Sequence, residues 1–284
     1  SSSEFSDQLP MKLSLSCRIA ESSQRKDVAA MPIDELAPMA AEAGFVGLSM
    51  HASAVSVDTP KPRIHEIRAL LDRYGLSASM VMGNVPLAAN SPDAPSCLRN
   101  ITPHLELAEI LGTTLVRVMI QTAADIPFAQ RSADEARERG IVLAQQTHWG
   151  TLAETVDETL DLMLRIELPN FGVTFEPANL LACGDNYGPD ALRRLMPYLV
   201  NFYFQNIRLD RSGAHTFMTR TRGPVSLSYL PLDDPSGIEI SPLIDVLRKC
   251  DYAGWVSVHQ PLRGGQSVVD ALDEAASVLV PLVA

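Results

Sequence analysis

The chain alternates short apolar runs with amphipathic segments along nearly its whole length. Eight of the runs have the length and composition of β-strands, and segments of helical periodicity separate them. Strands that alternate with helices form parallel sheets, because each helix returns the chain to the edge where the previous strand began. Over 284 residues, this pattern predicts an α/β protein with a single (β/α)8 barrel.

The bounds of these elements follow from the apolar periodicity and from glycines that end helices. Gly44, Gly75, Gly112 and Gly140 each follow a helical segment. The strands are expected over residues 11–16, 45–50, 76–82, 114–120, 141–146, 171–176, 200–206 and 254–259. The helices are expected over residues 33–43, 60–74, 98–111, 126–139, 152–165, 191–198, 241–250 and 267–280.

Two segments interrupt the rhythm. Residues 83–94 are rich in Pro, Asn and Gly and are expected to form a loop. Residues 209–238 show no clear helix, and loops of this length are usually functional lids or disordered. Since this segment leaves the seventh strand, we expect a long loop over the rim of the barrel. Residues 1–10 are polar and resemble a disordered leader, a processed terminus or an artificial remnant, which leaves residues 11–284 as one domain.

Composition excludes several classes of partner. The net charge of −11 and the pI near 5.0 oppose nucleic-acid binding, which needs clustered Lys and Arg. No apolar run reaches the roughly 18 residues that a membrane span requires. The four cysteines, far apart and without a C-x-x-C pair, are expected to be buried free thiols. We therefore expect a cytoplasmic protein in a reducing compartment.

Polar residues gather where the later strands end, and the carboxyl ends of barrel strands are where catalytic residues lie. His259 is the candidate for proton transfer near neutral pH, and a hydrogen-bonded core histidine is the alternative. Glu176 could orient His259, bind a hydroxyl or act as a second base, and a salt bridge to Arg208 is the alternative. These two residues form the predicted catalytic pair.

Other side chains near the strand ends suit a carbohydrate ligand. Amides donate and accept hydrogen bonds to vicinal hydroxyls, and a Trp can pack against a sugar face. Arg208, Arg211 and Arg18 could bind a carboxylate or phosphate, although Asp210 could equally pair with the first two. The remaining candidates for substrate binding are Gln146, Gln205, Asn206, His51, His148 and Trp149.

Four segments resemble those of the xylose isomerase-like TIM barrels, namely LGTTLVRV, GIVLAQQTHWGTLAET, FGVTFEPANLLACG and GIEISPLIDVLRKCDYAGWVSVHQ. Their order and spacing cover most of residues 11–280. That superfamily includes sugar-phosphate isomerases and epimerases, ketose 3-epimerases, hydroxypyruvate isomerase and endonuclease IV. The resemblance implies the same barrel fold and a divalent metal held by Glu, Asp, His and Glu on strands five to eight.

The chain departs from that ligand set at every position, because the matching residues are Gln146, Glu176, Gln205 and His259. Asn179 replaces a further histidine, whereas His148 and Arg211 match residues of the family. Amides are weak ligands beside carboxylates, so no firmly held metal is expected. A weakly bound Mn2+, Mg2+ or Zn2+ on Glu176 and His259 is the alternative.

The resemblance implies a sugar isomerase or epimerase that transfers a proton next to a carbonyl. Its substrate would be a small keto sugar, polyol or sugar acid. A keto-sugar lyase or dehydratase begins with the same step and remains an alternative. A non-catalytic carbohydrate-binding relative with a decayed metal site is the second alternative. The acidic charge disfavours an endonuclease, and the sequence leaves a homo-oligomer open.

Overall fold

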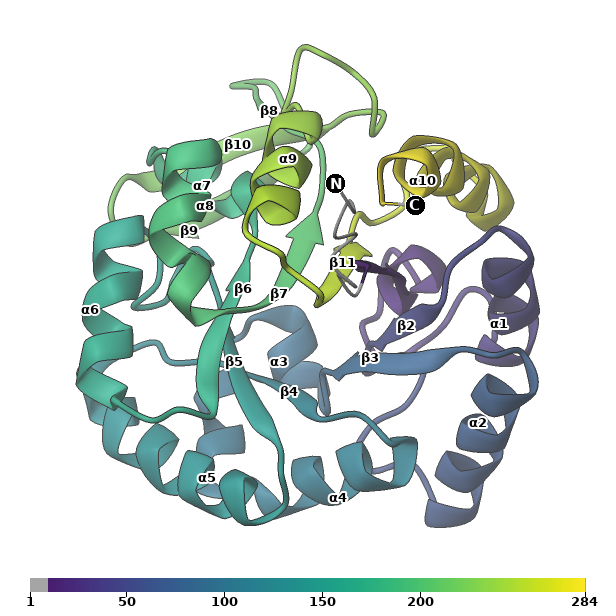
Figure 1. The fold of residues 1–284 in the computed structure, drawn as a ribbon. Coiled ribbons are helices and arrows are strands. Elements are labelled where there is room, and N and C mark those ends of the chain that lie inside the picture. The colour runs from purple at the N-terminus through teal and green to yellow at the C-terminus, as the bar shows by residue number, and fades with distance from the viewer. Residues whose placement is uncertain (1–9, 284) are drawn as a thin grey trace, which may run out of the picture.

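The computed structural model describes residues 10–283, which form a closed barrel of parallel strands inside a ring of helices (Figure 1). The predicted (β/α)8 fold is confirmed. Strand β11 pairs with β1 and closes the barrel. Nearly all of the leader predicted over residues 1–10 lies outside the described residues. The barrel strands are β1 Lys12–Ser16, β2 Gly47–Met50, β3 Ser77–Val81, β4 Leu115–Val118, β5 Val142–Gln146, β6 Phe171–Phe175, β7 Leu199–Phe204 and β11 Trp255–Val258.

Helices pack their apolar faces against the outside of these strands and bury the main hydrophobic core. Helix α4 ends at Leu111 and is followed by Gly112, whose φ of 73° is in the left-handed region that glycine adopts without strain. The outer helices are α1 Ile33–Glu42, α2 Lys61–Arg73, α4 Thr102–Leu111, α5 Ile126–Glu138, α6 Val156–Ile166, α8 Pro189–Leu195, α9 Ser241–Lys249 and α10 Val268–Val283.

Several helices begin later than the periodicity predicts. Helix α6 begins after Thr155, whose hydroxyl accepts the backbone N–H of Glu158 at 3.2 Å and so caps the helix. The helix predicted over residues 98–111 is divided, because Asn100 leaves the helical region with φ −148°. A 3-10 helix precedes that residue, and α4 follows it. Two short helices without a predicted counterpart, α3 Val85–Ala89 and α7 Pro177–Cys183, follow β3 and β6.

Side chains meet across the inside of the barrel. The hydroxyls of Ser49 on β2 and Tyr203 on β7 are 2.6 Å apart, and these strands are not neighbours. Ser14 and Ser79 likewise join β1 to β3 at 2.7 Å. The barrel is therefore filled rather than open as a channel. Tyr203 also packs in a small apolar cluster with Met80, Leu115 and Ala144.

A three-stranded antiparallel sheet, which we call the rim sheet (residues 207–229), follows β7. The sequence indicates a long loop over residues 209–238, but the whole of β9 and β10 lies within that segment. Phe217 pairs with Val225, and only one face of the sheet is covered, so no continuous apolar run reveals the strands. The strands are β8 Ile207–Leu209, β9 His215–Thr219 and β10 Gly223–Tyr229.

The cysteines are free, and Cys17, Cys97 and Cys183 are buried as predicted. Cys250 is exposed, because it follows the last turn of α9. Within residues 10–283, no helix has the length and apolar character needed to cross a bilayer.

Glu154 attaches the rim sheet to the loop that follows β5. Its side chain is fully buried, and Oε1 accepts the backbone N–H groups of Gly150 and Arg220, both at 2.6 Å. Oε2 accepts the N–H of Thr221 at 2.8 Å, in the turn between β9 and β10. Three backbone donors compensate the carboxylate for its burial. Glu154 therefore fixes the rim sheet over the barrel.

Glu154→Gln should loosen this attachment, because an amide nitrogen cannot accept the N–H of Thr221. We expect faster backbone deuterium exchange in residues 215–229, measured by mass spectrometry. The free energy of unfolding should fall by about 2 kcal/mol.

Asp157→Asn is the matched control, since the Asp157 side chain is 83% exposed and pairs with Arg194 on the surface. Its exchange pattern should match that of the unsubstituted protein. Equal exchange of the rim sheet in both variants would contradict the role of Glu154.

Candidate functional site

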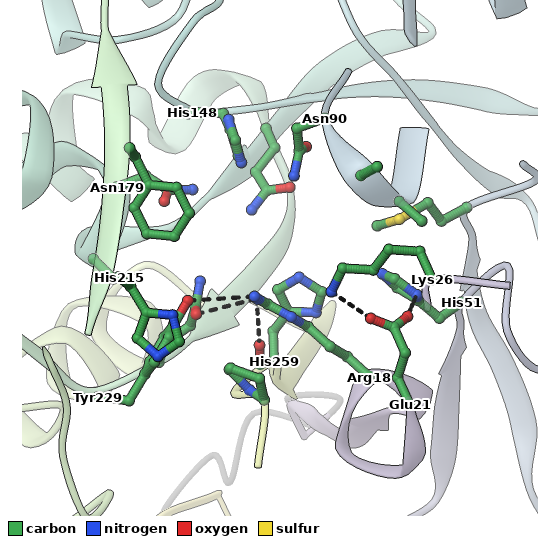
Figure 2. Close-up of a pocket in the computed structure, with 18 of the residues that line it drawn as sticks. Arg18, Glu21, Lys26, His51, Asn90, His148, Asn179, His215, Tyr229 and His259 are labelled. Atoms are coloured by element: carbon green, nitrogen blue, oxygen red, sulfur yellow. Dashed lines mark hydrogen bonds and ion pairs between the residues drawn. The ribbon is translucent and has the colours of Figure 1, made fainter. Parts of the chain in front are cut away.

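A cavity of about 310 Å³ lies between the carboxyl ends of the barrel strands and the rim sheet. This volume is at the lower end of the range for small-molecule sites. Strand-end and loop residues supply the polar wall, and the rim sheet supplies most of the aromatic one (Figure 2). Wall residues from the barrel side include Arg18, His51, Arg117, Gln146, Gln205 and His259, and those from the rim sheet include His215, Phe217, Leu227 and Tyr229.

Glu176 lies behind this wall and is fully buried. The side-chain Nε2 of Gln146 donates to one of its oxygens, and Nε2 of Gln205 donates to the other. Burial raises the pKa of Glu176 to about 7, although both amides and two arginines act in the opposite direction. The carboxyl group therefore changes charge near neutral pH.

Arg18 projects from the 3-10 helix after β1 into the middle of the rim. Its Nη1 donates to Oε1 of Gln205 and to the backbone oxygen of His259, both at 3.2 Å. Its Nη2 donates to the hydroxyl of Tyr229 at 3.3 Å, which joins the barrel to the rim sheet. The guanidinium is thus held in place and retains N–H groups that no residue engages in the described chain.

His259 follows β11, and its ring stacks on Tyr203 with the centroids 4.1 Å apart. Nδ1 lies 2.9 Å from the hydroxyl of Ser16. Burial lowers the pKa of His259 well below its usual value, and the charge of Arg18 acts in the same direction. The imidazole is therefore neutral at physiological pH, and Ser16, rather than Glu176, holds its orientation.

Glu21 connects two basic side chains at the same end of the barrel (Figure 2). One oxygen contacts Nδ1 of His51, and the other accepts from Nζ of Lys26. Burial would raise the pKa of Glu21, but its contacts with His51 and Lys26 outweigh burial and lower it. Burial, together with the charges of Arg18 and Lys26, lowers the pKa of His51 although the Glu21 carboxylate raises it. The result is a neutral imidazole whose Nδ1 lies against a carboxylate.

His148 lies across the cavity from His259 (Figure 2), and Trp149 also lines the cavity. Nδ1 of His148 lies 2.7 Å from the backbone oxygen of Trp149. Burial lowers the pKa of His148 to about 3, so this ring is a hydrogen-bonding group rather than a base at neutral pH. Trp149 stacks on Phe217 of the rim sheet at 4.8 Å, which closes the cavity with aromatic faces.

The residues at the implied metal positions do not fit a divalent ion. Both oxygens of Glu176, the one carboxylate among the four, accept hydrogen bonds from Gln146 and Gln205. The Arg18 guanidinium occupies the neighbouring space and would repel a cation. Hard ions need several anionic oxygens. In the described chain, no group of three or more His, Cys, Asp or Glu side chains has a suitable arrangement either.

The structure brings together most of the residues predicted from the sequence. Glu176 lies behind the wall and contacts two of them. Arg18 and His51, which the sequence also suggested, line the cavity as well. The predicted residues that line the cavity directly are Gln146, His148, Trp149, Gln205 and His259.

Three predicted binding residues lie elsewhere. The Asn206 side chain donates to the backbone oxygens of Pro231 and Asp234 and accepts from Ile238, so it holds the segment after the rim sheet. Arg208 and Arg211 are exposed and absent from the cavity wall. Strand β8 directs Arg208 outward, because neighbouring side chains alternate between its faces.

Sequence reasoning did not single out Glu21, Lys26, Arg117 or Tyr229 as site residues, although all four line the cavity. Arg117 carried a usable signal, since a charge inside the apolar run TLVRVMI is rarely buried without a role. Glu21 and Lys26 lie in the irregular segment after β1, where no periodicity indicates which side chains point inward.

Residues 38–280 match the model of a protein family described as xylose isomerase-like TIM barrel. No curated protein sequence matches the chain. Solved structures similar to the chain include the probable 3-DHS dehydratase AsbF of Bacillus anthracis. Its TM-score is 0.71 at 19% identity, over 95% of this chain and 99% of that one.

A xylose isomerase domain protein of Planctomyces limnophilus has a TM-score of 0.72 at 14% identity, over 97% of this chain and 96% of that one. D-psicose 3-epimerase of Clostridium cellulolyticum H10 has a TM-score of 0.64 at 13% identity, over 96% and 99%. At these identities the similarity concerns the fold.

The Glu176 carboxyl should leave a signature in the pH dependence of stability. Its pKa is about 7 in the folded protein against an ordinary value of 4.5, so the folded state binds more protons between these pH values. This group should therefore make the free energy of unfolding fall as pH rises from 4.5 to 7, by about 3 kcal/mol. Above pH 7 its contribution should be constant.

Glu176→Gln removes this titration but keeps the shape of the side chain. Urea unfolding of both proteins between pH 4.5 and 8.5 measures the effect as a difference, in which all other titrating groups cancel. Parallel curves over that range would show that Glu176 has an ordinary pKa.

Proposed function

The chain belongs to the xylose isomerase-like TIM barrel family, and we propose that it is a sugar isomerase or epimerase that works without a divalent metal. Its reaction would begin with removal of a proton next to a carbonyl on a small carbohydrate. The observation that carries this proposal is the position of Arg18. Its guanidinium contacts two of the four residues at the implied metal positions, within the wall of the cavity.

Removing a proton next to a carbonyl places negative charge on the carbonyl oxygen. A fixed positive group beside that oxygen lowers the barrier, because the group is already oriented before the reaction begins. Three hydrogen bonds hold Arg18, and its remaining N–H groups are available to an oxygen in the cavity. Arg18 can therefore supply the charge stabilisation that a divalent cation would otherwise give.

His51 is the best-placed proton acceptor. Glu21 contacts Nδ1, which keeps the proton on that nitrogen and leaves Nε2 as the basic atom. Glu21 also stabilises the imidazolium that forms when Nε2 takes a proton. Lys26 contacts the other oxygen of the carboxylate, so the contact with Nδ1 is kept, although the charge of Lys26 lowers the pKa of His51.

His259 is the second acid–base candidate, as the sequence predicts. Its ring centroid is 6.0 Å from that of His51, so the two imidazoles can reach neighbouring atoms of one substrate. A neutral imidazole fixed by Ser16 can donate to a carbonyl oxygen or return a proton there. In this scheme His51 removes the proton from the carbon next to the carbonyl, and His259 donates a hydrogen bond or a proton to the carbonyl oxygen.

Glu176 and its two amides would set the pattern of hydroxyl contacts rather than take part in proton transfer. Oε1 of Gln146 is buried and lacks a hydrogen-bond partner among the described residues. Since buried acceptors are rarely left unpaired, a substrate hydroxyl is a suitable donor to it. Glu176 holds this amide in position through Nε2.

We expect chelator-treated protein to exchange hydrogen for deuterium next to the carbonyl of its substrate. The assay is proton NMR in D2O with EDTA present, across keto sugars and sugar acids. His51→Gln should slow the exchange by roughly 100-fold or more, since it removes the base. The products identify isomerisation, epimerisation or loss of water, all of which follow the same first step.

His65→Gln is the matched control, because His65 is exposed on α2 and outside the cavity wall. Its exchange rate should equal that of the unsubstituted protein. The proposal fails if exchange stops with EDTA and returns only with a divalent metal, or if His51→Gln leaves the rate unchanged. Ligand binding without any exchange would instead indicate a carbohydrate-binding protein.

A further inference from the structure

Arg117 is a guanidinium buried inside the barrel, with only 1% of its surface exposed. It lies on β4, where Nη1 donates to the backbone oxygen of Leu87 at 2.8 Å and Nη2 donates to Oδ1 of Asn90. Nε has no hydrogen-bond partner among the described residues. Among the described residues, no carboxylate forms a salt bridge with Arg117. Its side chain nevertheless lines the cavity.

This arrangement is unfavourable for a buried guanidinium. A buried charge is costly unless an opposite charge and a full set of hydrogen bonds compensate it. Burial lowers the pKa of Arg117 only to about 10, so the group stays protonated at neutral pH. An anion in the cavity would supply the missing partner.

The charges around the cavity lead to the same conclusion. Arg18, Lys26 and Arg117 contribute three cations to the wall. Glu21 contributes a carboxylate, and Glu176 lies behind the wall as a second one. When Glu176 is ionised, one positive charge is uncompensated among these described groups, in a protein whose net charge is −11. Since the pKa of Glu176 is about 7, the positive excess is larger below that pH.

We propose that Arg117 and Asn90 form a subsite for the carboxylate of a sugar acid. Asn90 and His148 lie across the cavity from His259 and Tyr229 (Figure 2). A substrate could thus place its carboxylate at Arg117 and its carbonyl at Arg18 and the two imidazoles. The inference rests on the proposed function only for the reaction that follows binding.

Above pH 7, where Glu176 is ionised, the single excess charge favours a carboxylate over a phosphate ester. A phosphate carries about −1.5 to −2 charges at neutral pH and would leave the cavity negative. The planar fork of a guanidinium also matches the two oxygens of a carboxylate. A neutral sugar would leave Arg117 uncompensated.

The test measures binding without turnover, by thermal shift and by Trp149 fluorescence. Each set of probes differs in one substituent. The first set is D-glucuronate as the carboxylate, D-glucose as the neutral sugar and glucose 6-phosphate as the phosphate ester. Two further pairs compare D-galacturonate with D-galactose and D-gluconate with D-glucitol. We expect at least one carboxylate to raise Tm at millimolar concentration, and its neutral counterpart to leave Tm unchanged. Arg117→Met should weaken carboxylate binding by about tenfold or more.

Arg117→Lys keeps the charge but loses the fork, so its affinity should fall between those of Arg and Met. Arg137→Gln is the control, because that side chain is 54% exposed and pairs with Asp134 on α5. The inference is overturned if no carboxylate binds, if the neutral sugar or the phosphate binds better, or if both Arg117 variants bind normally. The unsubstituted protein alone decides the first two outcomes, even if a variant does not fold.

The outcome is separable from that of the exchange assay. Carboxylate binding that depends on Arg117, without deuterium exchange, would support the anion subsite and refute the proposed reaction. Exchange on neutral keto sugars, without any preference for acids, would support the reaction and refute the subsite.

Discussion

The site depends on one electrostatic arrangement, in which the buried carboxyl group of Glu176 lies near two guanidinium groups, those of Arg18 and Arg117. Each arginine lowers the pKa of Glu176, although burial still raises it to about 7. Amides at Gln146 and Gln205 make this arrangement possible, because each can donate to Glu176 without adding charge. Carboxylates at those two positions would attract a divalent ion, which would displace Arg18. Neutral amides at these positions are therefore compatible with a guanidinium beside Glu176.

The rim sheet makes this charge arrangement effective. It covers the carboxyl end of the barrel, and Tyr229 holds Arg18 while Phe217 stacks on Trp149. Charges interact more strongly in a cavity from which water is excluded. Glu154 is distant in sequence from β9 and β10, and it holds the rim sheet through backbone N–H groups of the turn between them. The attachment through Glu154 therefore involves none of the side chains that line the cavity.

The sequence predicted the barrel and the rim positions, because strand periodicity is local and parallel strands bring their ends together. Gln146, Gln205 and His259 lie where that rule places them. The rule does not determine which side of a new strand faces inward, so it places Arg208 at the site although the side chain is exposed. The rim sheet was missed because its strands are half-exposed and rich in Ser and Thr. The contact between Glu21 and His51 depends on tertiary structure that no spacing encodes.

The positive charge of the cavity also couples the binding of an anion to the pKa values of His51 and His259. Burial holds His51 and His259 neutral, and Arg18 and Lys26 lower the pKa of both rings further. A bound anion would offset part of that positive potential and raise both pKa values towards the ordinary one. The imidazoles would then be stronger bases in the complex than in the free protein. A neutral ligand of the same shape would leave them weak, so the charge of the substrate would contribute to catalysis as well as to affinity.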